Sequence, residues 1–209
     1  MIFELLFLVL FLASLIALVG AVIMMTGRRR GNRAPRLLRT LAVVWAVYLS
    51  IVFTVSATTP QRIVPLGQDI CFDEMCFSVV RAEIFPQLGS GEHVVTTNGR
   101  FYVVTVRVSS HSRSRAQSEG GIHAELWDSG KYYGLSSEGQ RAWETTNGPT
   151  RPLAARLQPG ESVLSTQVFD VPRQSLSPSL ILSHGFTPGY FVIGECPIFH
   201  KPTMQRLTP

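Results

Sequence analysis

Phe-Tyr-Val-Val-Thr-Val-Arg-Val-Ser, residues 101–109 of this 209-residue chain, is a run of β-branched and aromatic residues with a two-residue alternation. In an extended strand, successive side chains point to opposite faces. One face therefore carries Val104, Val106 and Val108, and the other carries Val103, Thr105 and Arg107. One apolar and one mixed face are typical of a strand that lies on a hydrophobic core.

The remainder of residues 60–209 has the same character. Short runs of strand-forming residues alternate with clusters of Gly, Pro, Ser and Asn. The other candidate strands are 63–70, 76–84, 122–127, 131–135, 163–171, 179–182 and 190–193. A weak helix candidate, 137–145, contains Gly139, and we expect it to be a short turn on a loop. This pattern predicts an all-β sandwich rather than a βαβ fold.

Two further motifs lie in this region: Leu-Gln-Pro-Gly-Glu-Ser-Val at 157–163 and Gln-Val-Phe-Asp-Val-Pro at 167–172. With residues 101–109, they resemble the telokin-like, immunoglobulin-fold domains of bacterial envelope proteins, over residues 63–195. The resemblance implies an immunoglobulin-like sandwich behind a lipoprotein signal or membrane anchor. Members of that family largely lack an assigned activity, so the resemblance transfers no catalytic residues.

Two apolar segments precede the predicted sandwich. Residues 5–27 and residues 40–61 contain no charged side chain, and about 20 apolar residues suffice to cross a membrane as a helix. A cleaved signal peptide would have a basic start and a shorter apolar core, whereas here Glu4 precedes the first segment and arginines follow it. We therefore expect a retained transmembrane α-helical hairpin.

The connection between the two helices is strongly basic. Residues 28–39 contain Arg28, Arg29, Arg30, Arg33, Arg36 and Arg39. Short loops rich in arginine stay on the cytoplasmic side, so the N-terminus and the predicted sandwich should lie outside. The expected protein is a multi-pass protein of the inner (cytoplasmic) membrane, with the lipid bilayer as its first partner.

The predicted organisation has six parts: helix 1 (1–27), the basic cytoplasmic loop (28–39), helix 2 (40–58), a short linker (59–66), the sandwich (67–200) and a C-terminal tail that frays (201–209). Residues 60–209 contain 13 basic and 13 acidic residues, so we expect no nucleic acid as partner. Small residues recur every four positions in both helices and predict a packing seam: Ala13, Ala17 and Ala21, and Ala42, Ala46 and Ser50. The alternative is that alanine is simply common in such helices.

Cys71 and Cys76 flank Phe-Asp-Glu-Met and are the candidate disulfide. Directly opposite residues of an antiparallel hairpin have Cα atoms about 4.5 Å apart, which a disulfide can bridge. Free thiols and a pairing of either cysteine with Cys196 remain open. A further alternative is soft-metal (copper) handling through Cys71, Met75 and Cys76, since thiolates and a thioether suit Cu(I). Its supporting histidines would come from His93, His111, His123, His184 or His200.

Motifs of enzyme chemistry are missing from the sequence. It contains no GxSxG, P-loop, GxGxxG, HExxH or EF-hand pattern, and we predict neither catalytic residues nor a cofactor. A hydrolase would require a Ser or Asp beside a histidine in a cleft. The main hypothesis is a non-enzymatic envelope protein that displays its sandwich to an envelope partner. Exposed connectors at 111–121, 145–152 and 173–178, or an edge strand, would make the contact.

Overall fold

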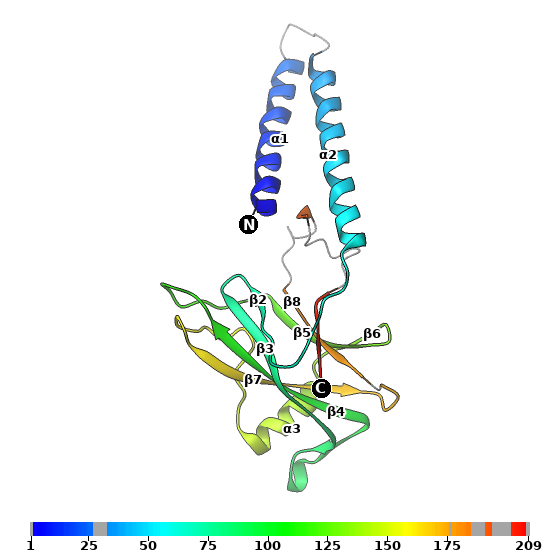
Figure 1. The fold of residues 1–209 in the computed structure, drawn as a ribbon, viewed down its shortest axis with the longest axis vertical. Coiled ribbons are helices and arrows are strands. Elements are labelled where there is room, and N and C mark those ends of the chain that lie inside the picture. Colours follow the sequence, from blue (N-terminus) through cyan, green and yellow to red (C-terminus); the bar gives the residue numbers. More distant parts are fainter. Residues whose placement is uncertain (1, 27–32, 176, 185–190, 194–201, 208–209) are drawn as a thin grey trace. The chain divides into compact units, whose positions relative to one another are not determined.

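The computed structural model describes residues 2–26, 33–175, 177–184, 191–193 and 202–207. Within it the chain forms two compact units (Figure 1). The first contains Met1–Gln61 and Thr187–Lys201, and the second contains Arg62–Phe186 and Pro202–Pro209. The predicted fold class is confirmed: two apolar N-terminal helices are followed by a β-sandwich.

The first unit is built on helices α1 (Ile2–Thr26) and α2 (Arg33–Thr58). α2 begins inside the predicted basic loop, which is therefore shorter than we expected. Three hydroxyls near the C-terminal end of α2 are bonded within the helix. Those of Ser50, Thr54 and Thr58 each donate to the carbonyl four residues earlier, at 2.7, 2.7 and 2.8 Å. Such bonds satisfy the hydroxyl donors of polar side chains on an apolar helix without water.

The second unit is a sandwich of two sheets (Figure 1). The four-stranded sheet has the order β2 (Ile70–Phe72), β3 (Met75–Leu88), β4 (Val95–Ser110) and β7 (Ser162–Val171). The five-stranded sheet has the order β1 (Ile63–Val64), β9 (Met204–Arg206), β8 (Ser179–His184), β5 (Ile122–Asp128) and β6 (Lys131–Tyr133). All neighbouring strands are antiparallel except the pair β1 and β9.

The alternation in β4 places its residues as predicted. Val104, Val106 and Val108 are fully buried in the main core. They share this core with large side chains of both sheets, among them Phe77, Phe169, Leu126 and Leu180. The sheets therefore hold together by burying one apolar face each.

The second face of β4 is also covered, which corrects one expectation. Residues 137–145 do not form a short turn but most of helix α3 (Ser137–Asn147). Ser136 caps this helix, since its Oγ accepts a hydrogen bond from the N–H of Gly139 at 3.1 Å. A second, smaller core lies under the helix and consists of Leu88, Phe101, Val103, Ala142 and Val168.

Gly139 explains why α3 can lie so close to the sheet. A Cβ at this position would stand 2.8 Å from Cγ1 of Val168 and 3.0 Å from Cε1 of Phe101. The residue that argued against a helix, because glycine disfavours helices, is the one that makes its packing possible. Local propensity was a poor guide here because tertiary packing decides the conformation.

α3 also covers the outer edge of β7. The Gln140 side chain donates from Nε2 to the carbonyl of Thr166 at 3.1 Å, and its Oε1 accepts from the N–H of Val168 at 3.0 Å. The N–H of Ser136 donates to the carbonyl of Val168 at 2.8 Å. Part of an edge strand is thus closed to further pairing.

The C-terminal segment differs from its prediction as well. We expected residues 201–209 to fray, but Met204–Arg206 forms β9 between β1 and β8. Gln205 is fully buried and bonds to backbone groups of β3 and of the connection before β2. The candidate strand 190–193 is also wrong for its described part. Residues 191–193 are not a strand and belong to the helical unit.

Candidate functional site

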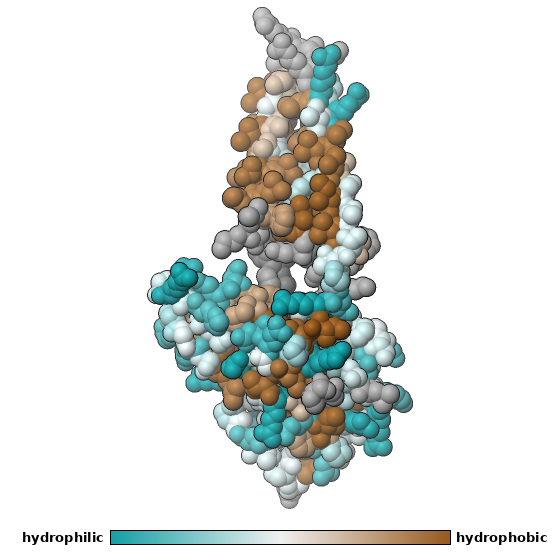
Figure 2. All heavy atoms as spheres, viewed as in Figure 1, coloured by the Kyte–Doolittle hydropathy of each residue, from teal (hydrophilic) through white to brown (hydrophobic). Residues whose placement is uncertain are grey.

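The lateral surface of the helical unit is its most distinctive feature. Leu5–Met25 and Ala34–Thr58 are long and apolar enough to cross a membrane, yet only 11% and 17% of these spans are buried. Figure 2 shows apolar side chains over much of the one face of this unit that is in view. The exposed ones include Leu8, Phe11, Leu15, Ile16, Val19, Ile23, Val43, Val47 and Ile51. An apolar surface this continuous is unfavourable in water and favourable in hydrocarbon.

The two helices meet along a different seam from the predicted one. Ala42, Ala46 and Ser50 of α2 are exposed, as is Ala13 of α1, whereas Ala21 is buried. The contact is made instead by large side chains around Tyr48 and Val52: Phe7, Leu10, Trp45 and Leu49. Four-residue spacing of small side chains was therefore a misleading indicator in α2, because aromatic residues fill the space between the helices.

One polar contact lies within this seam. Trp45 Nε1 donates to Ser14 Oγ at 2.9 Å, and the same hydroxyl donates to the carbonyl of Leu10 at 2.6 Å. Trp45 also lies edge-on to Phe7 and to Tyr48, with ring centroids 6.4 and 5.8 Å away. Sequence reasoning assigned no role to Trp45 or Tyr48, because their positions far from the ends of the apolar run suggested no interfacial anchor.

The topology-determining arginines flank the start of α2. Arg36 and Arg39 are exposed in its first turns, and Arg33 is its first residue. Arg28, Arg29 and Arg30 lie outside the described residues. Arg39 is the last of these arginines, and the part of α2 that follows it, residues 40–58, contains no charged side chain.

The candidate cysteines pair as the hairpin geometry predicted. Cys71 and Cys76 are directly opposite each other in β2 and β3, with Cα atoms 4.0 Å apart and a disulfide joining their sulfurs. The turn is shorter than expected, since Phe72 also pairs with Met75. Asp73, at a φ of 50°, takes the left-handed conformation that this tight turn requires. Cys196 lies outside the described residues.

This arrangement gives copper handling no support. The disulfide leaves Cys71 and Cys76 without thiolates, and Met75 is buried in the main core. His93, His111 and His123 are exposed on separate elements. His200 and the side chain of His184 lie outside the part of the chain that the structure describes. Among the described residues, no group of three or more His, Cys, Asp or Glu side chains could hold a metal ion.

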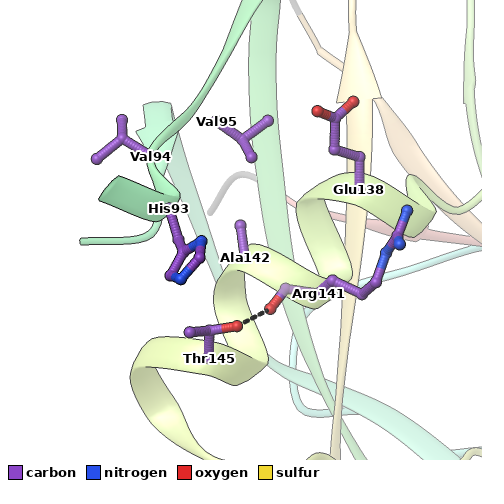
Figure 3. Close-up of a pocket in the computed structure, with 7 residues that line it drawn as sticks. All are labelled: His93, Val94, Val95, Glu138, Arg141, Ala142 and Thr145. Carbon is purple, nitrogen blue, oxygen red and sulfur yellow. Dashed lines mark hydrogen bonds between the residues drawn. The ribbon is translucent and has the colours of Figure 1, made fainter. Parts of the chain in front are cut away.

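A hollow of about 420 Å³ lies between the 3₁₀ turn η1 (Gly91–His93) and helix α3. Figure 3 shows its lining, in which His93, Val94 and Val95 lie on one side and the helix α3 residues Glu138, Arg141, Ala142 and Thr145 on the other. The hydrogen bond drawn there runs from Thr145 Oγ1 to the backbone carbonyl of Arg141, at 2.8 Å. That bond lies within α3, and the ionisable side chains lining this hollow are those of His93, Glu138 and Arg141.

A second hollow, of about 520 Å³, lies beside the end of β7. Its lining includes Thr97, Asn98, Tyr133, Asp170 and Arg173. Thr97 Oγ1 donates to Asp170 Oδ1 at 2.7 Å and accepts from the N–H of Gly99 at 2.9 Å. These bonds tie Thr97 to Asp170 and to the backbone of Gly99, which is typical of a structural turn.

Two of the three predicted connectors, 111–121 and 145–152, are held by hydrogen bonds within the second unit. Within 111–121, Gln117 exchanges both backbone hydrogen bonds with Leu157 and its side chain donates to Glu74. Residues 145–147 belong to α3, and Thr150 Oγ1 donates to Glu144 Oε1 at 2.5 Å. Hydrogen bonds from Gln140 and Thr150 hold the pKa of Glu144 below its ordinary value.

This chain resembles known proteins weakly. No protein-family model and no curated protein matches it. It is similar to a conserved hypothetical protein from Bacillus anthracis, at 14% identity and TM-score 0.47, over 56% of this chain and 88% of that one. An uncharacterized β-sandwich protein from Clostridium difficile 630 shows 13% identity and TM-score 0.43, over 72% and 96%. The secreted protein MPT63 from Mycobacterium tuberculosis shows 16% identity and TM-score 0.38, over 62% and 94%.

Proposed function

We propose that this protein is a non-enzymatic envelope protein, anchored in the cytoplasmic membrane by α1 and α2, that presents a telokin-like, immunoglobulin-like sandwich outside the cytoplasm. The observation that carries the proposal is the exposed apolar surface of both helices. Spans of 21 and 25 residues match a hydrocarbon layer about 30 Å thick. Hydrocarbon is the solvent in which such a surface is stable.

The arginines supply the orientation. Arginine-rich short connections remain in the cytoplasm, so the ends of the helical hairpin remote from Arg33, Arg36 and Arg39 lie outside. The sandwich follows α2 and is therefore extracytoplasmic in this proposal. The disulfide between Cys71 and Cys76 supports the same side, because disulfides persist in oxidising compartments.

Display is the mechanism that this arrangement supports. A domain tethered to a membrane meets neighbouring envelope molecules at an effective concentration set by its linker, without any new contact. Recognition would fall to the solvent-facing parts of the sandwich. Leu164 on β7 and Tyr132 on β6 are exposed apolar side chains on its edge strands.

A topology experiment tests the proposal on the full chain. Alkaline phosphatase, which is active only outside the cytoplasm, and green fluorescent protein, which fluoresces only inside it, are fused in turn after Pro209. We expect an active phosphatase and a dark fluorescent protein. Fusions after Arg30 are the matched control and should give the reverse pair. A fluorescent C-terminal fusion would contradict both the orientation and the display role.

A further inference from the structure

The chain leaves the sandwich between β8 and β9. Thr187–Lys201 belongs with the two helices rather than with the sheets that precede and follow it. Residues 191–193, Phe-Val-Ile, are the described part of this excursion. In the sequence, Glu195 is the one charged residue between Phe186 and Phe199.

Residues 191–193 make specific contacts with the helical hairpin. The ring of Phe191 stacks on that of Phe7, with centroids 6.1 Å apart and planes 7° apart. Ile193 packs against the cluster around Tyr48 and Val52. Val192 is 2% exposed, whereas Phe191 keeps 45% of its surface exposed.

A hydrogen bond accompanies these apolar contacts. Tyr48 Oη donates to the backbone carbonyl of Phe191 at 2.7 Å. A hydroxyl on a membrane span and a carbonyl in an irregular segment are both unfavourable in hydrocarbon unless they find partners. Each satisfies the other here, which is the condition under which non-helical backbone is tolerated at membrane depth.

The helices indicate how deep this contact lies. Phe7 is two residues beyond Leu5, the first residue of the α1 span, or about 3 Å along a helix. Tyr48 is nine residues beyond Arg39, or about 14 Å along α2. In a hydrocarbon layer about 30 Å thick, Phe7 lies near the outer edge and Tyr48 lies close to the middle.

We infer that residues 191–193 enter the outer leaflet as a re-entrant segment, held on the hairpin by Tyr48 and Phe7 and contacting lipid acyl chains through the exposed part of Phe191. The bilayer would then bind this protein at two places in the sequence, before β1 and between β8 and β9. The inference rests on the proposed membrane anchor.

The test is tryptophan quenching in phosphatidylcholine and phosphatidylglycerol vesicles with brominated acyl chains, using the full chain. Phe191→Trp adds a fluorophore at the proposed contact, Ile193→Trp adds one beside it, and Tyr132→Trp is the control on β6. We expect bromine to remove most of the emission added at 191 and 193 and little of that added at 132. Tyr48→Phe in the Phe191→Trp background should restore part of the quenched emission, whereas Thr54→Val, which breaks a bond within α2, should not.

The emission of the native Trp45 distinguishes failure of the re-entrant segment from failure of the membrane anchor. If its emission is quenched and the added emission at both 191 and 193 is not, the anchor stands and the re-entrant segment is refuted. If the wild-type chain neither floats with vesicles nor loses Trp45 emission to bromine, both the anchor and this inference are refuted. Equal quenching at 191 and 132 would also refute the inference, because the lipid contact would not be specific to this segment.

Discussion

Replacement of Gln205 by methionine perturbs the attachment of the C-terminal strand to the sandwich. The Gln205 side chain is fully buried. It bonds to β3 at Val79, beyond Phe77, the last residue of β3 that pairs with β2. Its Oε1 accepts from the N–H of Val79 at 2.9 Å, and its Nε2 donates to the carbonyls of Gln68 at 2.7 Å and Pro65 at 3.3 Å. Methionine has a similar volume and removes all three bonds with little change in packing.

The expected loss follows from which groups can reach water. Val79 is fully buried, so its N–H would remain unpaired, at a cost of about 1–3 kcal/mol. Gln68 and Pro65 belong to an exposed connection whose carbonyls can turn to solvent, so their lost bonds add about 1 kcal/mol. The unfolding free energy should fall by about 2–4 kcal/mol, a large part of the ~5–15 kcal/mol typical of a domain.

Urea unfolding of the full chain in detergent micelles, followed by tryptophan fluorescence, measures this loss. With a slope of about 2 kcal/mol per M, in the middle of the usual range for urea, the midpoint should drop by about 1–2 M. Gln174→Met is the matched control at an exposed glutamine and should leave the midpoint unchanged. A Gln205→Met variant within about 0.5 kcal/mol of the wild type would refute the reasoning, since that is the range of ordinary surface changes.

Three further outcomes are expected. Gly139→Ala should lower the unfolding free energy by about 1–3 kcal/mol, because the added Cβ would meet Val168 and Phe101, even though alanine favours helices. The control Gly134→Ala, which has open space around it, should not change the unfolding free energy in the same urea titration. Because the pKa of Glu144 is lowered on folding, its stabilisation is complete above the ordinary value of 4.5 and is lost as the pH falls through the folded value. Glu144→Gln should therefore flatten the acid limb of the pH–stability curve, and an unchanged limb would contradict this. Cys71→Ser with Cys76→Ser should cost about 2 kcal/mol, and a reducing agent should produce the same loss in the wild type; no loss in either would show that the disulfide does not stabilise the fold.

Local periodicity made much of the fold predictable. The alternation of Val104, Val106 and Val108 placed these residues in the core, and the length of the two uncharged runs predicted α1 and α2. The pairing of Cys71 with Cys76 was predictable because the two are neighbours in one β-hairpin. In each case the signal is local, since the spacing of residues along one segment and its backbone geometry leave few arrangements.

Helix α3 shows where prediction from local sequence fails. Phe101 and Val103, on the second face of β4, are buried in the smaller core under α3. Their pattern alone did not identify α3 as the cover, since glycine lowers helix propensity and its benefit appears only against Val168.

By itself, the sequence determined two apolar helices with arginines between them, a β-rich domain after them and a closely spaced cysteine pair. Only the tertiary structure decided that α3 covers the second face of the sheet, that β9 completes the other sheet through Gln205, and that Phe191 joins the helices through Tyr48. The bonds of Gln205 to Val79 and of Tyr48 to Phe191 span 126 and 143 residues. No local period records such pairs, because they form only once folding has brought distant segments together and buried their polar groups beside one another.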